Sequence, residues 1–241
     1  MRTVVISQPM FLPWVGLFEQ MQMADVFVHF DDVQFPQGRS FVSRVQVKTR
    51  DGIRWISVPI ARDGSSPRIS DVCISEDGGW RRKHLETLRH NYGRAANFPA
   101  MFELAQELLL VPQSSLSEFN ILSLERIAAC LGLECTFVRA SALGRGGRSS
   151  ERLISICAEL GAETYVTGHG ARNYLDHEKF EEAGMTVRYM DYAVEPWPQL
   201  HGEFTPFVTV LDLMAAVPFS EARGHFRSEA VDWRTFLKRS P

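Results

Sequence analysis

The stretch TVVISQPMFLPWVGLFEQMQMADVFVHFDD, residues 3–32, decides the fold. Thr3 to Ser7 is a run rich in β-branched residues, which is typical of a strand buried on both faces. Helical periodicity follows from Trp14 to Met21, directly after Pro13, a residue that favours the start of a helix. Val26 to Phe30 reads as a second strand. Strand, helix and strand in this order predict a β-α-β unit with parallel strands and a right-handed crossover.

Downstream, the pattern changes to a hairpin followed by helices. Phe41 to Lys48 alternates apolar and polar residues, Asp51-Gly52 is a hairpin turn signal, and Ile53 to Ile60 is a second run of strand type. Three helices are predicted next, from Trp80 to Tyr92, from Pro99 to Leu110 and from Leu116 to Leu131. In the third, Ser117 is the predicted N-cap and Gly132 the stop.

The second half alternates strand and helix. The predicted elements are strands at Thr136 to Arg139, Thr164 to Thr167 and Thr186 to Tyr192, and a helix at Ser149 to Leu160. We therefore expect an α/β fold, a mostly parallel Rossmann-like sheet with helices on both faces, plus a β-hairpin and helical insert. At 241 residues, we expect one domain over 1–241, with the insert at about 40–115 and a C-terminal tail at about 215–241.

Composition excludes several classes of protein. With 45% hydrophobic and 23% charged residues the chain is globular, and its net charge of -3 argues against nucleic-acid binding. We expect no membrane span and no secretory signal, and hence a cytoplasmic protein. The four cysteines lack CxxC spacing, so we expect reduced thiols and no metal.

Ligands of doubly wound sheets bind at the carboxyl ends of the strands, which selects five loops. These loops are Gln8 to Trp14, Asp31 to Phe35, Ser141 to Ser149, Gly168 to Asp176 and Asp191 to Gln199. Gln8 is a binding candidate, whereas the apolar side chains near it, Trp14 included, either face the ligand or cap the core. Asp31 and Asp32 are candidates to hold a metal, to orient a substrate amine or hydroxyl, or to act as a general base; the alternative is that one caps a turn or helix and the other is solvated.

Basic residues supply candidates for anion binding. Arg44 and Lys48 lie four apart in a strand and share one face, so they either clamp a phosphate or carboxylate or are solvated. Arg145 and Arg148, in the glycine-rich segment Leu143 to Ser150 before a helix, favour a phosphate, although no nucleotide motif is present; the alternative is an ordinary flexible loop.

Two histidines are candidates for chemistry. His84 follows a cationic cluster, Trp80-Arg81-Arg82-Lys83, whose charge would lower its pKa and favour a neutral base; the alternative is a structural histidine. His169, between Gly168 and Gly170, is placed to donate to a substrate oxygen. Neither HExxH nor GxSxG occurs, and we expect no cofactor.

Several motifs in fixed order resemble the WbqC-like protein family over residues 3 to 214. They are ISQPMFLPWVGLF, VFVHFDDVQF, RVQVK, WRRKH with NY, TYVTGHGARNYLD and DYAVEPWPQLHGEFTPFVTVLDL. The resemblance implies work in surface-polysaccharide (O-antigen) or specialised-metabolite biosynthesis, with glycine or aminoacyl transfer onto an amino sugar suggested for some members. The resemblance also implies a non-catalytic residue in many relatives at the position of His169, which argues against a catalytic role for it. The site residues that the resemblance implies are Gln8, Trp14, Asp31, Asp32, Gln34, Arg44, Lys48, Lys83, His84, Gly168, Asp176 and Gln199.

Three hypotheses follow. The first is an acyl- or aminoacyltransferase, in which His84, Asp31 or Asp32 takes a proton from the amine of a small-molecule substrate such as a nucleotide-linked amino sugar. An acyl carrier is a potential partner of this enzyme. In a two-step version, Cys73 is the nucleophile. The second is a nucleotidylyltransferase-like enzyme, although the first loop lacks the HxGH histidines. The third is an accessory protein that binds a carrier or biosynthetic partner through an aromatic and basic surface around Trp80 to Tyr92.

Overall fold

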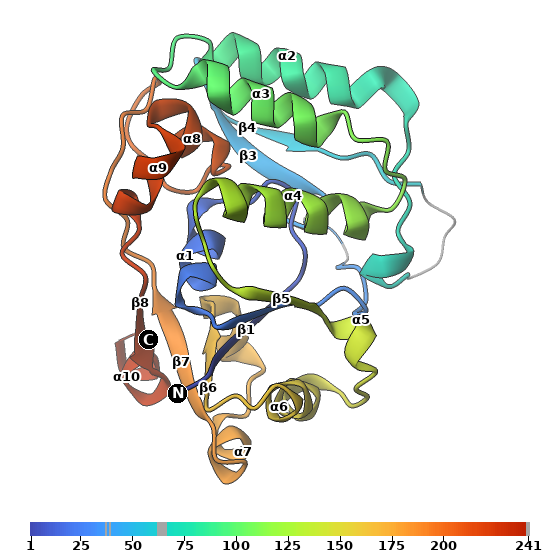
Figure 1. Cartoon of the computed structure of the whole chain (residues 1–241), viewed down its shortest axis with the longest axis vertical. Helices are drawn as coiled ribbons and strands as arrows, with labels where there is room; N and C mark the ends of the chain where they lie inside the picture. Colours follow the sequence, from blue (N-terminus) through green and yellow to red (C-terminus); the bar gives the residue numbers. More distant parts are fainter. Residues whose placement is uncertain (37, 39, 62–66, 240–241) are drawn as a thin grey trace.

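A six-stranded sheet forms the centre of the computed structural model, which describes residues 1–36, 38, 40–61 and 67–239 (Figure 1). Its strands are β1 (Thr3–Ser7), β2 (Val26–His29), β5 (Thr136–Arg139), β6 (Thr164–Thr167), β7 (Thr186–Asp191) and β8 (Glu229–Asp232), in the spatial order β5-β2-β1-β6-β7-β8. The first five are parallel, and β8 pairs antiparallel with β7. The predicted mostly parallel α/β sheet is therefore confirmed.

The order of the strands creates a topological switch point. From β1 the chain moves outward to β2 and then to the edge strand β5, before it returns to the other side of β1 as β6 and continues to β7. Connections therefore leave the neighbouring strands β1 and β6 in opposite directions. In doubly wound sheets, such a divergence opens a crevice outside the carboxyl ends of the two strands.

Helices cover both faces of the sheet, as predicted. Alternate strand residues face opposite sides. On one face Val5 and Phe27 share a core with α1 (Val15–Met23) and α4 (Leu116–Cys130). On the other face Val4 and Val28 pack in a core with α6 (Ser149–Glu159), α7 (His177–Glu182) and α10 (Trp233–Arg239).

The insert forms a second layer above the sheet in Figure 1. It contains the antiparallel hairpin of β3 (Arg44–Thr49) and β4 (Gly52–Ser57) with α2 (Trp80–Tyr92) and α3 (Phe98–Leu109). Buried residues of the hairpin and of both helices belong to the same core cluster as Val5 of β1. The shorter segments are η1 (Ile69–Asp71), η2 (Asp77–Gly79), α5 (Ala140–Leu143), η3 (His169–Asn173), α8 (Leu211–Ala216), α9 (Phe219–Ala222) and η4 (Arg223–His225). Residues 62–66 of the predicted insert and 240–241 of the predicted tail lie outside the described residues.

The start of α4 differs from the sequence prediction. Ser115, not Ser117, is the N-cap, because its side chain accepts a hydrogen bond from the Glu118 backbone N–H, whereas Ser117 is buried in the first turn. Both serines precede a hydrophobic run, so spacing alone does not separate them. The predicted stop at Gly132 is confirmed, since this residue follows the helix with φ +66.

The C-terminal tail supplies four elements that the sequence did not reveal, namely α9, η4, β8 and α10. β8 is no shorter than β5 and β6, but its residues Glu-Ala-Val-Asp include only one of the β-branched or aromatic type that favours a strand. Glu19 of α1 anchors the chain just before it, because its Oε1 accepts a hydrogen bond of 2.8 Å from the Arg227 backbone N–H. The tail thus completes the edge of the sheet.

Glu19 should make stability depend on pH. It is fully buried, its Oε2 has no hydrogen-bond partner among the described residues, and desolvation by burial raises its pKa despite the backbone hydrogen bonds that lower it. A raised folded-state pKa means that this contribution to stability is present at low pH and is lost as pH rises through that pKa. Urea unfolding between about pH 4 and pH 8 should therefore show Glu19→Gln gaining stability relative to wild type as pH rises. Glu203→Gln, at an exposed position, is the control; a constant difference between Glu19→Gln and wild type would contradict the expectation.

Candidate functional site

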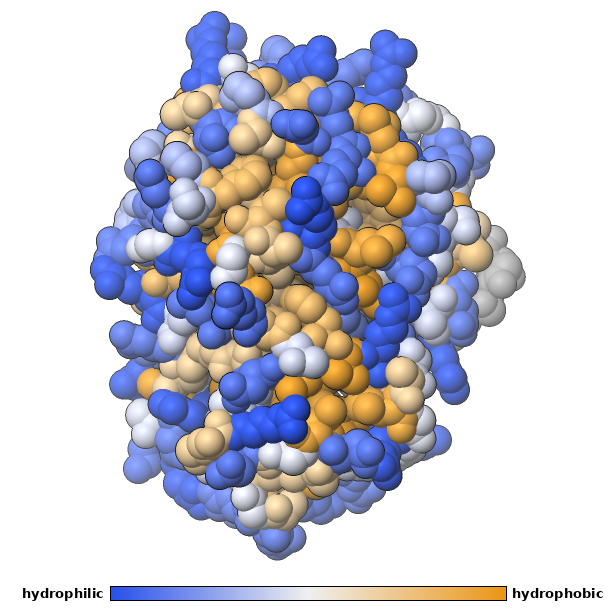
Figure 2. Space-filling model, in the orientation of Figure 1, coloured by the Kyte–Doolittle hydropathy of each residue, from blue (hydrophilic) through white to orange (hydrophobic). Residues whose placement is uncertain are grey.

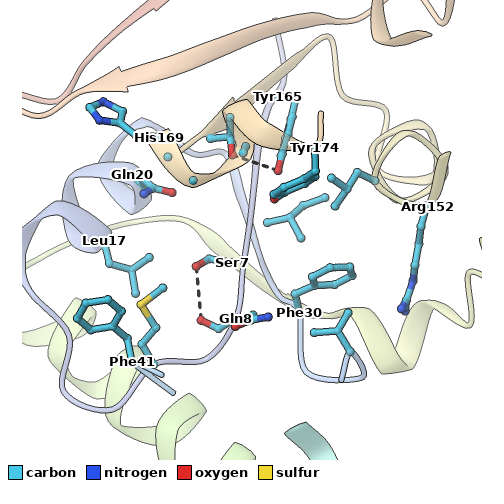
Figure 3. Close-up of a pocket in the computed structure, with 18 of the residues that line it drawn as sticks. Ser7, Gln8, Leu17, Gln20, Phe30, Phe41, Arg152, Tyr165, His169 and Tyr174 are labelled. Carbon is cyan, nitrogen blue, oxygen red and sulfur yellow. Dashed lines mark hydrogen bonds between the residues drawn. The ribbon is translucent and has the colours of Figure 1, made fainter. Parts of the chain in front are cut away.

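A cavity of about 1210 Å³ lies at the carboxyl ends of the parallel strands, at the switch point between β1 and β6 (Figure 3). All five loops selected by the carboxyl-end rule contribute to its wall. The described lining residues are Ile6, Ser7, Gln8, Met10, Trp14, Leu17, Gln20, Phe30, Asp32, Val33, Gln34, Phe41, Arg68, Gly147, Arg148, Ser149, Arg152, Leu153, Tyr165, Thr167, Gly168, His169, Gly170, Ala171, Tyr174, Tyr192 and Phe207. Its volume suffices for a ligand larger than a single small metabolite.

One side of the cavity is cationic. Arg68, Arg148 and Arg152 line it, and Asp32 is the one carboxylate among the described lining residues. Arg152 Nη2 binds Asp32 Oδ2, and the two side chains are only 14% and 15% exposed. Asp32 Oδ1 and Arg152 Nε are buried without hydrogen-bond partners in the described part of the chain. Three arginines against one carboxylate leave a net positive charge, which favours an anionic ligand.

The first turn of α6 belongs to this cationic side. Gly147, Arg148 and Ser149 lead into the helix and line the cavity, and Arg152 lies on the same helix. Free backbone N–H groups and the helix dipole make a helix N-terminus attractive to anions. The helix and the arginines therefore favour the same sign of ligand charge.

An aromatic and uncharged wall forms the other side. The Trp14 ring lies 4.8 Å from that of Tyr192 and 5.6 Å from that of Phe207, and Gln20 Nε2 donates to the Tyr192 hydroxyl. Trp14 reaches this position because residue 16 is glycine: a Cβ at Gly16 would come within 2.4 Å of the indole ring. The WxG spacing is thus explained by the close approach of the ring to the helix.

The loop between β1 and α1 is held from both sides. Asn120 Nδ2 donates to the Pro9 carbonyl oxygen at 2.9 Å, and Thr209 Oγ1 donates to that of Leu12 at 2.7 Å. Leu12 has φ +40, an unfavourable value for a non-glycine residue, so these bonds hold a strained backbone. A loop fixed in this way presents Gln8 and Trp14 in a set geometry.

Comparison with known proteins adds the family. The model of the WbqC-like protein family matches residues 8–223. The chain belongs to this family. It is also 31% identical over 216 residues to "Uncharacterized protein Rv1507c" of Mycobacterium tuberculosis (strain ATCC 25618 / H37Rv), which covers 89% of this chain and 93% of the relative. No solved structure matches significantly.

The range that the family model matches includes nearly the whole cavity lining of this WbqC-like protein. Apart from Ile6 and Ser7, every described lining residue falls within the matched range, whereas β8 and α10 fall outside it. The relative's name states no activity, so the comparisons give the family and leave the reaction to the chemistry of the site.

The cavity brings together about half of the predicted site residues. Those that line it are Gln8, Trp14, Asp32, Gln34, Arg148, Gly168 and His169. Those outside its described lining are Asp31, Arg44, Lys48, Lys83, His84, Arg145, Asp176 and Gln199. Within the cavity, His169 turns its side chain toward β7, where Nε2 lies 2.7 Å from the Met190 carbonyl oxygen; Figure 3 shows the ring pointing away from Ser7 and Gln8.

Two of the predicted bases have structural contacts instead of facing the cavity. Asp31 accepts hydrogen bonds from the backbone N–H and hydroxyl of Ser141, at 3.0 and 2.6 Å, and so connects the end of β2 to α5. His84 is buried beside the rings of Phe11 and Trp80, with Nε2 3.0 Å from the Ser57 carbonyl oxygen. Its pKa is lowered, as predicted, but the main cause is burial and not a neighbouring cation.

Arg44 and Lys48 do not form a joint anion clamp. Arg44 stacks over the Trp55 ring at 4.1 Å. Lys48 is buried and its Nζ donates to Gln199 Oε1 at 2.6 Å, while Gln199 Nε2 donates to Asp212 Oδ1 at 2.8 Å. Both Lys48 and Gln199 therefore belong to an internal network that joins the hairpin to the segment before α8.

The remaining three predicted residues lie at the surface. Lys83 is exposed on α2, and Arg145 forms an ion pair with Glu159. Asp176 is the N-cap of α7, where its Oδ1 accepts from the Lys179 backbone N–H at 3.3 Å. The contacts of Arg145 and Asp176 account for these two side chains without a ligand.

The predicted aromatic surface around Trp80 to Tyr92 is wrong. Trp80 is 5% and Tyr92 2% exposed, because both face the core. Among the described residues, the exposed aromatic side chains are instead Phe41, Trp55, Tyr174 and Phe207, and all of these except Trp55 line the cavity. Figure 2 shows further hydrophobic residues reaching the surface in a broken band down the face viewed in Figure 1.

The described residues give little support to a metal site or to a cysteine nucleophile. Within the described ranges, His, Cys, Asp and Glu do not gather in groups of three or more that could hold a metal ion. Burial raises the pKa of Cys135 to about 11 and that of Cys157 to about 12. Cys73 is exposed and outside the described cavity lining.

No helix that the structure describes has the length and apolarity to cross a membrane.

The predicted site residues do not include nine described lining residues with polar side chains, which are Ser7, Gln20, Arg68, Ser149, Arg152, Tyr165, Thr167, Tyr174 and Tyr192. Gln20 and Arg152 lie inside helices, where a polar residue normally faces solvent. Tyr192 follows directly on β7 and was accessible to the carboxyl-end rule.

Proposed function

We propose that this WbqC-like protein is a small-molecule transferase that moves an acyl or aminoacyl group, glycyl included, onto an amine, in surface-polysaccharide or specialised-metabolite biosynthesis. The observation that carries the proposal is the cavity itself: its described lining at the switch point holds three arginines and a single carboxylate, that of Asp32. Arginines suit a phosphorylated ligand, and a carboxylate suits an amine. A phosphorylated donor and an amino-sugar acceptor, itself nucleotide-linked, fit this charge pattern.

In this proposal, the anionic group of the ligand is bound by Arg68, Arg148 and Arg152. Arg152 holds Asp32 with Nη2, and its Nε remains without a partner in the described structure. Guanidinium groups bind phosphate oxygens through charge-assisted hydrogen bonds, and the N-terminus of α6 adds to the attraction. Arg44 and Lys48, the first candidates for this role, are replaced in the proposal by these three residues.

Asp32 is the proposed general base. Its Oδ1 is buried and free of hydrogen bonds to described residues, whereas Oδ2 is held by Arg152. The amine nitrogen attacks the acyl carbonyl carbon, a C–N bond forms, and the bond from that carbon to the leaving group breaks. The proton leaves the amine for Asp32 Oδ1 and passes on to the leaving group, so that atoms and charge balance.

Arg148→Ala tests the anion site. Loss of one charge-assisted hydrogen bond should weaken binding of inorganic pyrophosphate by about 10- to 100-fold in isothermal titration calorimetry at low salt. Arg145→Ala is the matched control, since Arg145 lies in the same loop but pairs with Glu159. Equal losses in both variants would indicate only a general change of charge, and no loss in Arg148→Ala would contradict the assignment.

The strand order favours a second candidate, a nucleotide-binding enzyme that transfers a nucleotidyl group. The order β5-β2-β1-β6-β7 with a cavity between β1 and β6 is the arrangement in which doubly wound sheets bind nucleotides. Release of pyrophosphate from a nucleoside triphosphate would support this candidate over acyl transfer. A partner complex with no small-molecule binding would instead support an accessory role.

A further inference from the structure

Three residues form an uncharged wall across the cavity from the arginines. Gln20 comes from α1, Gly168 follows β6, and Tyr192 follows β7. Figure 3 shows Gln20 on the side of the cavity opposite Arg152. We call Gln20, Gly168 and Tyr192 the neutral wall.

The neutral wall has hydrogen-bonding capacity that the protein does not use. Gln20 is 7% exposed, and its Nε2 donates to the Tyr192 hydroxyl oxygen. In the described part of the chain, Gln20 Oε1 and the Tyr192 O–H have no other partner, which leaves one acceptor and one donor side by side. Rotating the amide by 180° exchanges the two roles and again leaves a donor and an acceptor.

Both groups stay uncharged at neutral pH. Burial raises the pKa of the Tyr192 hydroxyl well above its usual range, so that it keeps its proton and acts as a donor. The Trp14 and His169 rings flank Tyr192 at 4.8 and 5.1 Å. The neutral wall is therefore polar at its centre, and the rings of Trp14 and His169 border it.

Gly168 leaves space that any other residue would fill. Its backbone has φ −86 and ψ 169, values open to every amino acid, so conformation does not demand glycine. A Cβ at this position would lie 2.8 Å from the Tyr192 hydroxyl oxygen and 3.5 Å from Gln20 Nε2. A side chain here would displace Tyr192 and break the pairing with Gln20.

We propose that the neutral wall recognises an uncharged ring bearing hydroxyl or secondary amide groups, as a sugar does, and that Gly168 determines whether such a ring fits. Hydroxyl and amide groups match adjacent donor and acceptor positions, and aromatic faces suit the C–H surface of the ring. The inference rests on the proposed function, in which the arginine side holds the phosphorylated group, and it assigns the acceptor to the opposite side.

Two probes test the two sides separately. N-acetylglucosamine, measured by saturation-transfer NMR titration, should bind wild type and lose about tenfold in affinity in Tyr192→Phe and in Gly168→Ala. Pyrophosphate, measured by calorimetry, should bind both variants as it binds wild type. Gly224→Ala is the control, because a Cβ there meets nothing within 4 Å. Tyr192→Phe decides the matter where Gly168→Ala fails to fold.

The outcomes separate the two proposals. N-acetylglucosamine that fails to bind wild type, or binds wild type and Tyr192→Phe equally, overturns the neutral-wall inference even if pyrophosphate binds. Pyrophosphate that fails to bind wild type overturns the anion site of the proposed function, whatever the sugar does. Equal losses for both probes in Tyr192→Phe would also overturn the inference, since they would indicate a general collapse of the cavity.

Discussion

Asp32→Asn should lower the rate of acyl transfer by about 10²- to 10⁴-fold, the range expected when a general base is removed. Asparagine keeps the size of the side chain, and its Oδ1 can still accept a hydrogen bond from Arg152, but an amide cannot take up the amine proton. Single-turnover rates with a saturating acceptor would measure the loss directly. Binding of the acceptor should change much less than the rate.

Asp31→Asn is the matched control, because it removes a charge from the adjacent residue. Asp31 faces Ser141 and does not line the cavity, so its replacement should act on stability and leave the rate within about threefold of wild type. If Asp31→Asn lowered the transfer rate and Asp32→Asn did not, Asp31 would be the general base and Asp32 the structural residue. Full activity in both would remove the aspartates from the mechanism.

The elements of the sheet could be predicted because their signals are local. Runs such as Thr3 to Ser7 and Thr164 to Thr167 combine β-branched or aromatic residues over strand length, and the structure gives both the predicted bounds. The carboxyl-end rule then located the cavity, since loops far apart in sequence meet where parallel strands end. β8, by contrast, has the sequence Glu-Ala-Val-Asp, in which three of the four residue types are depleted in strands, and its pairing with β7 depends on tertiary contacts.

Individual site residues were harder to predict because their roles depend on distant partners. Lys48 lies on a strand face as a basic residue should, yet Gln199, 151 positions later, makes it an internal group. Asp32 and Arg152 are 120 positions apart, and no spacing rule connects them. His84 follows a cationic cluster in sequence, but Phe11 from the first loop packs against it. Sequence thus locates the loops better than the side chains that face the ligand.

The internal network leads to the largest expected effect on stability. Asp212 is 3% exposed and accepts hydrogen bonds from Trp197 Nε1 at 2.6 Å and from Gln199 Nε2 at 2.8 Å. Desolvation raises its pKa and lowers that of Lys48, and the attraction between the two opposes both shifts. Burying Lys48 and Asp212 together therefore costs free energy, but removing one of them would cost more, because it would leave the other charge buried and unpaired.

Asp212→Ala should lower the free energy of unfolding by about 3–5 kcal/mol, because it leaves buried Lys48 without its countercharge and the buried Trp197 N–H without its acceptor. Urea unfolding followed by tryptophan fluorescence measures the change. Asp71→Ala, at an exposed carboxylate, should cost less than about 0.5 kcal/mol. Adding Lys48→Met to Asp212→Ala should recover part of the loss, since it removes the unpaired charge; purely additive losses would show that the two side chains do not interact.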